Sequence, residues 1–281
     1  MWIELLNISA LVAIMFSMGL KSRFEDVMAS ARRSRLVLQG LVANFVLVPA
    51  VTVGLLWLFN ANPLVSVGFL ILAVCPGAPV GPPFSAIAKG DVPYSIGLMV
   101  ILAVLSAVLS PMLLGHLLGW LVPESDLQID SQAIVRTLLV FQVLPVAVGL
   151  SLQRWARTGT QRIVKPVSLL ANLLLVLVLV LILATQYPTL AAIRLRGWTG
   201  MLLLLGASLG IGWVLGGPDQ ATRKTLALTT AARNAAVGLV MVSSSFAGTP
   251  AVTAVVAYAL ASILGALACA VMLGRLTSPR P

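Results

Sequence analysis

The chain has 281 residues, of which 59% are hydrophobic and only 9% are charged. An ordinary globular domain has about 45–50% apolar and about 25% charged residues, so this composition excludes a soluble enzyme, a nucleic-acid-binding module and a disordered chain. The formal net charge of +10 is therefore interpreted as a signal of membrane topology. Cys75 and Cys269, the two cysteines, lie in apolar runs and indicate no disulfide framework.

Nine segments are long and apolar enough to cross a bilayer as helices, each of which needs about 20 residues. The predicted spans are residues 2–20, 36–59, 64–88, 93–117, 133–153, 166–186, 198–216, 225–246 and 250–274. Their apolar runs are continuous and do not alternate with polar residues, which favours helices over strands. We therefore expect an all-α polytopic membrane protein in which residues 1–281 form a single integral membrane domain.

The basic residues predict the orientation of these spans. Fourteen of the 18 fall on one side of the membrane if the first span runs inward from outside, namely Lys21, Arg23, Arg32, Arg33, Arg35, Lys89, Arg154, Arg157, Arg162, Lys165, Arg223, Lys224, Arg275 and Arg280. Because positive charge is retained in the cytoplasm, we expect an external N-terminus and a cytoplasmic C-terminus in the cell (inner) membrane. The first span has no basic n-region, so we interpret it as a retained span and not as a signal peptide.

Two of the nine segments are unusual. One cannot form a regular helix, and the other contains polar groups at mid-depth. The third holds a cluster of helix breakers: Pro76, Gly77, Pro79, Gly81, Pro82 and Pro83. The eighth holds four polar residues near its centre: Thr229, Thr230, Arg233 and Asn234. Irregular backbone at membrane depth is tolerated where it is buried in protein or lines a cavity. A pair of interrupted segments in two halves of a chain points to the binding site of a transporter.

The order of the segments suggests an inverted repeat. Residues 1–117 and 166–274 each contain four spans, with an interrupted span third in each set, and residues 133–153 link the two units. The two units begin with spans of opposite direction, so we expect two broken helices that cross near the membrane midplane.

Arg233 is a basic residue that the topology does not require. It lies roughly 13 Å from the inner end of its segment at 1.5 Å per residue, where a charge costs at least ~2.5–3.5 kcal/mol. No carboxylate is predicted at that depth. Two interpretations remain open: Arg233 binds carbonyl groups freed by the broken helices, or it awaits an anionic ligand, for which a guanidinium fork suits a carboxylate or sulfonate. Asn44, Ser95 and Asn234 are either interhelical hydrogen-bonding groups or ligands.

Four runs of the chain resemble the bile acid:sodium symporter superfamily. They are MFSMGL (15–20), ANFVLVPAV (43–51), AVCPGAPVGPPFSAIAKGDVPYSIGL (73–98) and KTLALTTAARNAAVGL (224–239). The resemblance implies a core domain with two crossed broken helices, a panel domain that moves against it, and secondary active transport of small organic anions by alternating access. It also implies a substrate site drawn from Arg233, Asn234, Thr229, Thr230, Asn44, Pro79 and Gly81.

The ion ligands that the resemblance implies are largely replaced. Gly81 and Pro82 stand where relatives place a Ser-Asn pair, and Met99 stands for a threonine four residues after the retained Ser95. Thr229 replaces the glutamate and Arg233 the glutamine of the second broken helix, in which Asn234 is kept. Asn44 stands for a glutamine of the second span. If Na⁺ is bound, its remaining candidate ligands are Ser95, Thr229, Asn44 and Asn234.

We therefore hypothesise that Arg233 supplies a fixed positive charge in place of a coupled cation, in a sodium-independent or proton-coupled carrier. Other inverted-repeat carriers, of the auxin-efflux or arsenite-permease type, are the alternative family, and a channel or scaffold is a more distant one. A membrane-embedded enzyme would need a nucleophile with a base, or paired acids, which the spans do not offer. The expected partners are a small organic anion and the lipid bilayer, without nucleic acid, metal site, cofactor or obligate protein partner.

Overall fold

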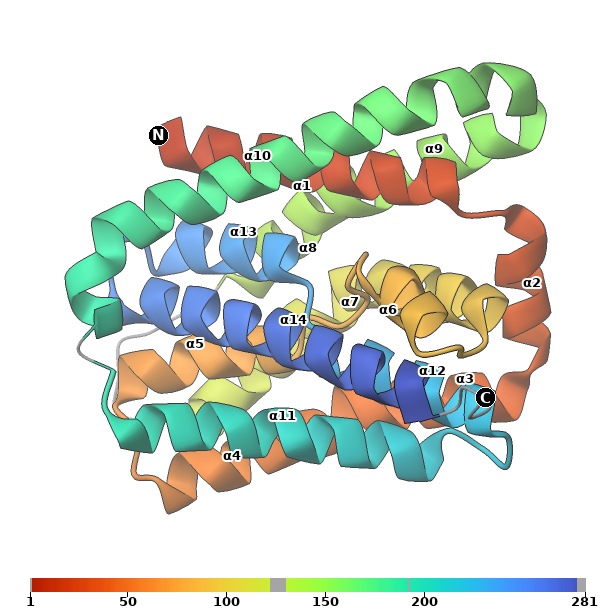
Figure 1. Cartoon of the computed structure of the whole chain (residues 1–281). Coiled ribbons are helices and arrows are strands. Elements are labelled where there is room, and N and C mark those ends of the chain that lie inside the picture. Colours follow the sequence, from red (N-terminus) through yellow and green to blue (C-terminus); the bar gives the residue numbers. More distant parts are fainter. Residues whose placement is uncertain (1, 122–129, 192, 277–281) are drawn as a thin grey trace.

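The computed structural model describes residues 2–121, 130–191 and 193–276 (Figure 1). These residues contain helices and connections and no strand. Eight helical stretches are long and apolar enough to cross a membrane: Glu4–Lys21, Ser34–Leu58, Val92–Trp120, Ser131–Trp155, Thr158–Pro188, Leu195–Leu215, Gln220–Ser245 and Pro250–Leu276. Each coincides with a predicted span, and the remaining predicted span, residues 64–88, is divided into two short helices. The all-α polytopic fold is thus confirmed. Arg280 lies outside the described residues.

Both predicted interruptions are present. The third segment forms α5 (Pro63–Ala73) and α6 (Gly81–Ile87), and the eighth forms α12 (Gln220–Ala231) and α13 (Ala235–Ser245). Asn62 caps α5 through its side chain, which accepts a hydrogen bond from the Leu64 N–H at 3.0 Å. Asn234 caps α13 in the same way. Asparagine side chains therefore cap the first half of one broken helix and the second half of the other.

Other boundaries differ from the prediction. α7 (Val92–Leu121) and α10 (Arg157–Ala191) are 30 and 35 residues long and extend past the predicted spans. The helices are longer than the spans because they can continue into the water-facing interface, where solvent satisfies the backbone. The short helix α2 (Phe24–Arg32) was not predicted. It packs against α7, where Ser30 lies so close to Gly97 that a Cβ on the glycine would meet the serine Oγ at 2.1 Å.

Two spans contain a wide π turn. One span consists of α3 (Ser34–Val42), η1 (Ala43–Leu47) and α4 (Val48–Leu58), and another of α8 (Ser131–Leu138), η2 (Leu139–Val143) and α9 (Leu144–Trp155). Pro49 and Pro145 follow the two turns at the same spacing. Because proline lacks an N–H and displaces the carbonyl four residues earlier, it favours a widened turn. The turns hold Asn44 and Gln142, both fully buried.

The helices form two groups. α1 (Trp2–Lys21), α9 and α10 pack together, and Gly19 and Gly149 allow the backbones of α1 and α9 to touch, as small residues do in membrane interfaces. The second group contains both broken helices with α4, α7, α11 (Leu195–Leu215) and α14 (Pro250–Leu276). We call them the α1 group and the broken-helix group. They correspond to the panel and core that the resemblance implies, whereas the inverted repeat stays a prediction.

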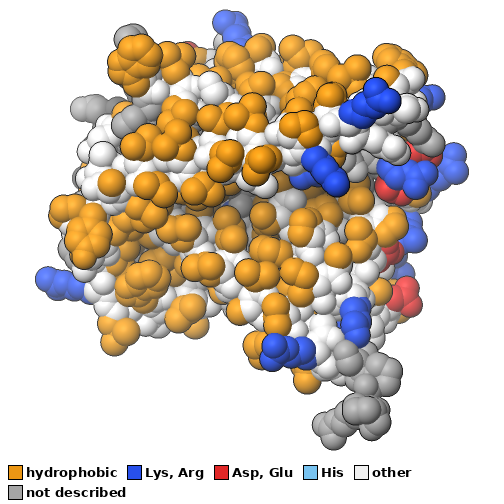
Figure 2. Space-filling model, turned by 45° about the horizontal axis from the view of Figure 1, so that its top comes forward, with side chains coloured by type: hydrophobic (Ala, Val, Ile, Leu, Met, Phe, Trp, Pro, Cys, Tyr) orange, Lys and Arg blue, Asp and Glu red, His pale blue; other side chains and the backbone are white. Residues whose placement is uncertain are grey.

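Charge gathers at one end of the bundle, and apolar side chains cover the flank between the ends (Figure 2). The charged end contains α2, the α9–α10 and α11–α12 connections and the last turn of α14 (Figure 1). Arg33 pairs there with Asp91 at 2.5 Å, and Arg154 lies 4.4 Å from the ring centre of Phe24. The flank includes exposed side chains of α10, such as Leu169 and Leu173. This arrangement is what an integral membrane protein requires.

Candidate functional site

The breaks of the two interrupted helices lie in contact with each other. The Asn234 backbone N–H donates to the Cys75 carbonyl at 2.9 Å, and its side-chain Nδ2 donates to the Gly77 carbonyl at 3.3 Å. The same side chain accepts from the Val237 N–H at 3.3 Å, which caps α13. Asn234 thus joins the second break to the first and begins the second half-helix.

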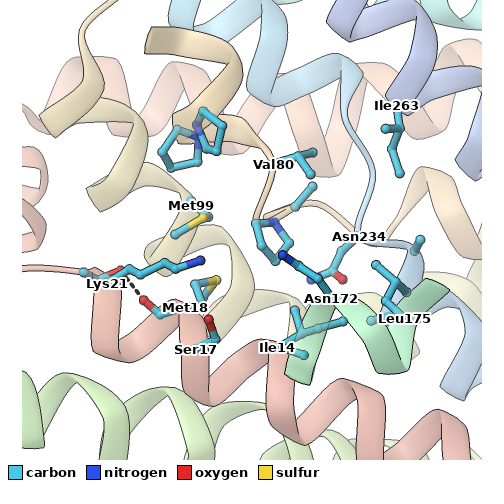
Figure 3. A pocket seen from close by; sticks show the side chains of 18 of the residues that line it. Ile14, Ser17, Met18, Lys21, Val80, Met99, Asn172, Leu175, Asn234 and Ile263 are labelled. Atoms are coloured by element: carbon cyan, nitrogen blue, oxygen red, sulfur yellow. Dashed lines mark hydrogen bonds between the residues drawn. The ribbon is translucent and has the colours of Figure 1, made fainter. Parts of the chain in front are cut away.

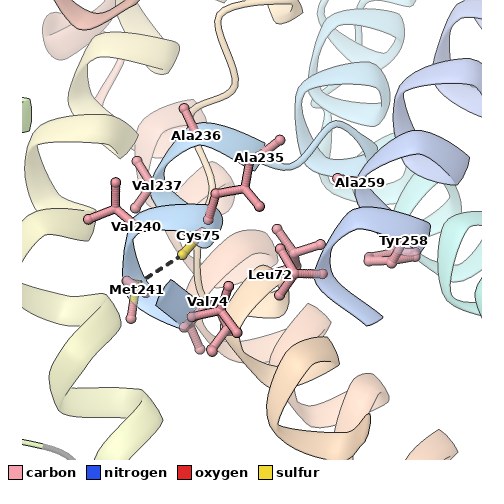
Figure 4. Close-up of a cluster of buried hydrophobic side chains, with 14 of the residues drawn as sticks. Leu72, Val74, Cys75, Ala235, Ala236, Val237, Val240, Met241, Tyr258 and Ala259 are labelled. Atoms are coloured by element: carbon pink, nitrogen blue, oxygen red, sulfur yellow. Dashed lines mark hydrogen bonds between the residues drawn. The ribbon is translucent and has the colours of Figure 1, made fainter. Parts of the chain in front are cut away.

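Buried apolar side chains surround this contact on one side. Figure 4 shows Cys75 beside α13, with its sulfur 3.4 Å from that of Met241, and Leu72 and Tyr258 on neighbouring elements. These residues belong to the largest buried cluster of the described chain. Cys75 and Cys269 are both free, as the sequence indicated. The crossing is therefore a packed region whose few polar groups must find partners inside the protein.

Arg233 is fully buried, with 0% of its surface exposed. Its Nη1 donates to the Ala73 carbonyl and to the Asn44 Oδ1, both at 3.3 Å. Its Nε and Nη2 have no hydrogen-bond partner among the described residues. Ala73 ends α5, so the guanidinium faces the negative end of that helix dipole. Neither ion pair found within the described ranges includes Arg233. An amide, a carbonyl and a helix end thus hold the cation without a carboxylate.

A cavity of about 310 Å³ lies between the α1 group and the broken-helix group. Figure 3 shows side chains that point into it from both sides. From α1 and α10 they are Ile14, Ser17, Met18, Lys21, Asn172 and Leu175; from the breaks, α7 and α14 they are Pro79, Val80, Asn234, Met99 and Ile263. The cavity therefore contains a few polar groups on a mostly apolar wall, which is the usual composition of a small-molecule site.

The structure places the predicted substrate residues in two layers. Pro79, Arg233 and Asn234 belong to the cavity wall, although the Arg233 side chain is buried behind it. Asn44 and Thr230 lie deeper and are joined by a hydrogen bond of 3.3 Å from the Asn44 Nδ2 to the Thr230 hydroxyl. Asn44 of this deeper layer binds Arg233, and neither Asn44 nor Thr230 lines the cavity.

The remaining predicted residues form a second small cluster. Gly81 lies against Thr229, since a Cβ on the glycine would meet the threonine Cγ2 at 3.0 Å and the Ser95 Oγ at 3.6 Å. The Thr229 hydroxyl donates to the Thr225 carbonyl at 2.8 Å, and Ser95 accepts a hydrogen bond from Ser85 at 3.0 Å. These hydroxyls are therefore engaged within the protein. Across the described ranges there is no group of three or more His, Cys, Asp or Glu residues that could hold a metal.

Lys21 and Asn172 are cavity residues that the sequence analysis did not select. Lys21 was interpreted only as one of the charges that set the topology. Asn172 is a single amide in the leucine-rich run SLLANLLLV, and its polarity inside an apolar span was an available signal. The side chain of Lys21 points into the cavity in Figure 3.

Comparison with known proteins agrees with this arrangement. Residues 8–193 match the sequence profile of the Sodium Bile acid symporter family. The chain belongs to this family. It is 22% identical over 260 residues, covering 89% of this chain and 78% of the relative, to a sodium-dependent transporter of Bacillus subtilis (strain 168) named YocS. It is 27% identical over 166 residues, 59% of this chain and 43% of the relative, to a sodium-dependent organic anion transporter of Bos taurus.

Family membership makes this chain a membrane transporter of the bile acid symporter type. It also decides against the auxin-efflux and arsenite-permease alternatives. The site departs from the family pattern at the positions that the resemblance assigned to sodium. Asn44, the counterpart of a family glutamine, binds the guanidinium of Arg233, and Thr229 and Gly81 offer no carboxylate or amide.

Proposed function

We propose that this protein is a secondary active carrier of small organic anions that binds its substrate in the cavity between the α1 group and the broken-helix group. The observation that carries the proposal is a cavity at the crossing of two broken helices with a buried cation directly behind its wall. Half-helix ends at membrane depth are where secondary transporters hold substrates and ions. The printed name of the Bos taurus relative, an organic anion transporter, supports the same substrate class.

The proposed coupling differs from that of the relatives, which are named sodium-dependent. Arg233 supplies a permanent positive charge beside Asn44, so a coupled cation is not needed to offset the charge of an anionic substrate. A buried cation is costly unless it is hydrogen-bonded, and the amide and carbonyl bonded to Nη1 reduce that cost. Transport is therefore expected to be independent of sodium.

Uptake into proteoliposomes tests this coupling. Anion uptake should be equal when external sodium is replaced by choline, and strict sodium dependence would contradict the proposal. Arg233→Gln should reduce anion uptake at least about tenfold, since it removes the positive charge that acts on the anion from behind the cavity wall. Arg233→Lys is the matched control that retains the charge. Unchanged uptake by Arg233→Gln would assign Arg233 a purely structural role.

Alternating access is proposed to result from movement of the α1 group against the broken-helix group. The cavity extends towards the charged end, where Lys21 ends α1 and Ser22 follows it. Towards the other end, the two groups touch: the Asn7 Nδ2 of α1 donates to the Ser243 Oγ of α13 at 2.8 Å. These positions support a state in which the substrate reaches the cavity from the charged end, the predicted cytoplasmic side, while the opposite end is closed.

A reversible cross-link tests this movement. In a background without Cys75 and Cys269, a disulfide between Asn7→Cys and Ser243→Cys should hold the closed end shut, because these side chains are already in contact. We expect uptake to stop on oxidation and to return on reduction. A cross-linked protein that transports at the full rate would exclude this contact as a gate. Labelling of single cysteines from either side of the cell membrane tests the predicted external N-terminus.

A further inference from the structure

Lys21 is the last residue of α1, and its ammonium group points into the cavity (Figure 3). Among the described residues that line the cavity, Lys21 and Arg233 are the cations and no carboxylate is present. The side chain of Arg233 is fully buried, whereas that of Lys21 is exposed. Lys21 is therefore the cation that a molecule in the cavity could touch, and Arg233 acts on such a molecule from behind the wall.

Hydrogen bonds within the protein reduce the number of polar groups available to a ligand. The Ser22 hydroxyl donates to the Met18 carbonyl at 2.8 Å, and the Ser17 and Ser168 hydroxyls share a bond of 2.8 Å. Asn234 is engaged at the crossing. Asn172, by contrast, is exposed and points into the cavity from α10. Lys21 and Asn172 are thus the donors best placed for a ligand, and both belong to the α1 group.

The rest of the wall limits the body of the ligand. Ile14, Met18, Met99, Leu175 and Ile263 are apolar, and the volume of about 310 Å³ is at the lower end of the usual range for ligand sites. Of the two cations of the described wall, only Lys21 has a side chain that a ligand can touch, so one negative charge can pair with it directly. An extended apolar wall around a single cationic position fits a compact aliphatic monocarboxylate better than a dianion or a four-ring steroid acid.

We propose that Lys21, assisted by Asn172, binds the carboxylate of a small aliphatic monocarboxylate substrate, whose apolar body packs against the helix breaks. The proposal rests on the proposed function and names the substrate class and the anion-binding residue of the same site. The carboxylate is held by the α1 group and the body by the broken-helix group, so a bound substrate connects the two groups that move against each other.

The experiment compares charge removal at Lys21 with charge removal elsewhere at the same end of the bundle. Uptake of butanoate, isovalerate and octanoate into proteoliposomes is measured for the wild type, Lys21→Met, Lys21→Arg and Lys165→Met. Lys165 is an exposed residue of α10 that does not line the cavity, so it controls for loss of a topological charge. Asn172→Leu is measured in parallel, and succinate and uncharged isovaleramide serve as competitors.

Lys21→Met should raise the KM for the monocarboxylates about 10- to 100-fold, as expected for loss of a hydrogen bond to a charged group. Lys21→Arg should keep most of the wild-type affinity, Lys165→Met should match the wild type, and Asn172→Leu should raise KM several-fold. Isovaleramide should inhibit monocarboxylate uptake only weakly, and to the same extent in the wild type and in Lys21→Met. Recovery by Lys21→Arg excludes misfolding as the cause of a loss in Lys21→Met.

Three negative results have different meanings. If the wild type takes up the monocarboxylates and Lys21→Met has the same KM, Lys21 serves only topology and this inference is overturned while the proposed function stands. If the wild type takes up succinate but none of the three monocarboxylates, the proposed substrate class is wrong, whereas the proposed function as an organic anion carrier stands. If the wild type takes up no organic anion, the proposed function fails and this inference fails with it.

Discussion

The two helix breaks differ in what creates them. The first, between α5 and α6, has the sequence VCPGAPV and is followed by two more prolines, so its own covalent geometry prevents a continuous helix. The second, between α12 and α13, has the sequence ARN and contains no proline or glycine. Alanine, arginine and asparagine all occur in ordinary helices. The second break therefore requires a cause outside its own backbone.

That cause is contact with the first break. The carbonyls of Ala73, Cys75 and Gly77 are left free where α5 ends, and Arg233 and Asn234 donate to all three. The second helix opens because its donors bind the first break and because Asn234 caps α13. The comparison teaches that one break is fixed locally and that the other depends on it. Substitutions at the two breaks should therefore have different consequences.

Gly77 is the position of the first break with the largest expected effect. Its φ of +79° lies in the left-handed region, and a Cβ would meet the backbone N of Ala103 in α7 at 2.7 Å. Gly77→Ala combines a conformational cost of about 1–2 kcal/mol with an overpacking cost of about 1–3 kcal/mol. We expect a large fall in the thermal midpoint of the purified protein and loss of uptake.

Gly248 provides the control for this substitution, because it also has a positive φ of +74° but a Cβ there would meet nothing within 4 Å. Gly248→Ala should therefore lower the free energy of unfolding only by the conformational cost of about 1–2 kcal/mol, without the overpacking cost. Equal midpoints for the two variants would show that the close approach of α7 to the first break is unimportant.

Asn234→Ala should have the next largest effect and tests the dependence of the second break on side chains. It removes an N-cap, worth about 0.5–2 kcal/mol, and leaves the buried Gly77 carbonyl without the Nδ2 donor. Asn234→Ser keeps a capping oxygen, so its midpoint should fall less than that of Asn234→Ala. If neither variant is less stable than the wild type, the second break does not depend on this residue.

Part of this site could be predicted from the sequence. The Pro and Gly cluster at 76–83 predicts a break because these residues act through local geometry, and Arg233 is conspicuous because charges are rare in apolar spans. The interpretation that Arg233 binds a carbonyl freed by the broken helices is confirmed at Ala73. Which carbonyls Arg233 and Asn234 bind could not be predicted, since those of Ala73 and Gly77 lie about 155–160 residues away in the chain and any residue has a carbonyl. The second break is therefore defined by tertiary contacts and not by a sequence pattern of its own.

The residues that line the cavity were equally hard to predict from the sequence. Lys21 obeys the rule that places positive charge at the inner ends of spans, and nothing in its neighbours indicates that the side chain turns inward. The direction of a side chain at a helix end depends on which helices pack beside it. The spans were predictable because length and apolarity decide them, whereas α2 and the two π turns depend on packing and on the positions of Pro49 and Pro145.

Asn44→Ala is expected to lower the stability of the protein moderately, through the side chains that hold the second break. Asn44 accepts a hydrogen bond from Arg233 and donates to Thr230, so its removal leaves the guanidinium with the Ala73 carbonyl as its one remaining partner among the described residues. The expected loss is about 1–3 kcal/mol, the cost of a buried group left unsatisfied. Thermal midpoints of Asn44→Ala, Arg233→Met and the double variant form a cycle that measures their coupling. Additive changes would indicate that the two side chains do not interact.

Pro83→Ala is expected to have the smallest effect, because it removes one of several helix breakers at the first break. Pro83 lies in the first turn of α6, where a backbone N–H has no partner within the helix, and its ring is exposed at the cavity. The replacement should cost less than about 1 kcal/mol, mainly through greater freedom of the unfolded chain. Uptake should stay near the wild-type value, since Gly77 and the other prolines keep α5 and α6 apart. A fall in midpoint as large as that of Gly77→Ala would instead mean that the first break needs all of its prolines together and is no more robust than the second.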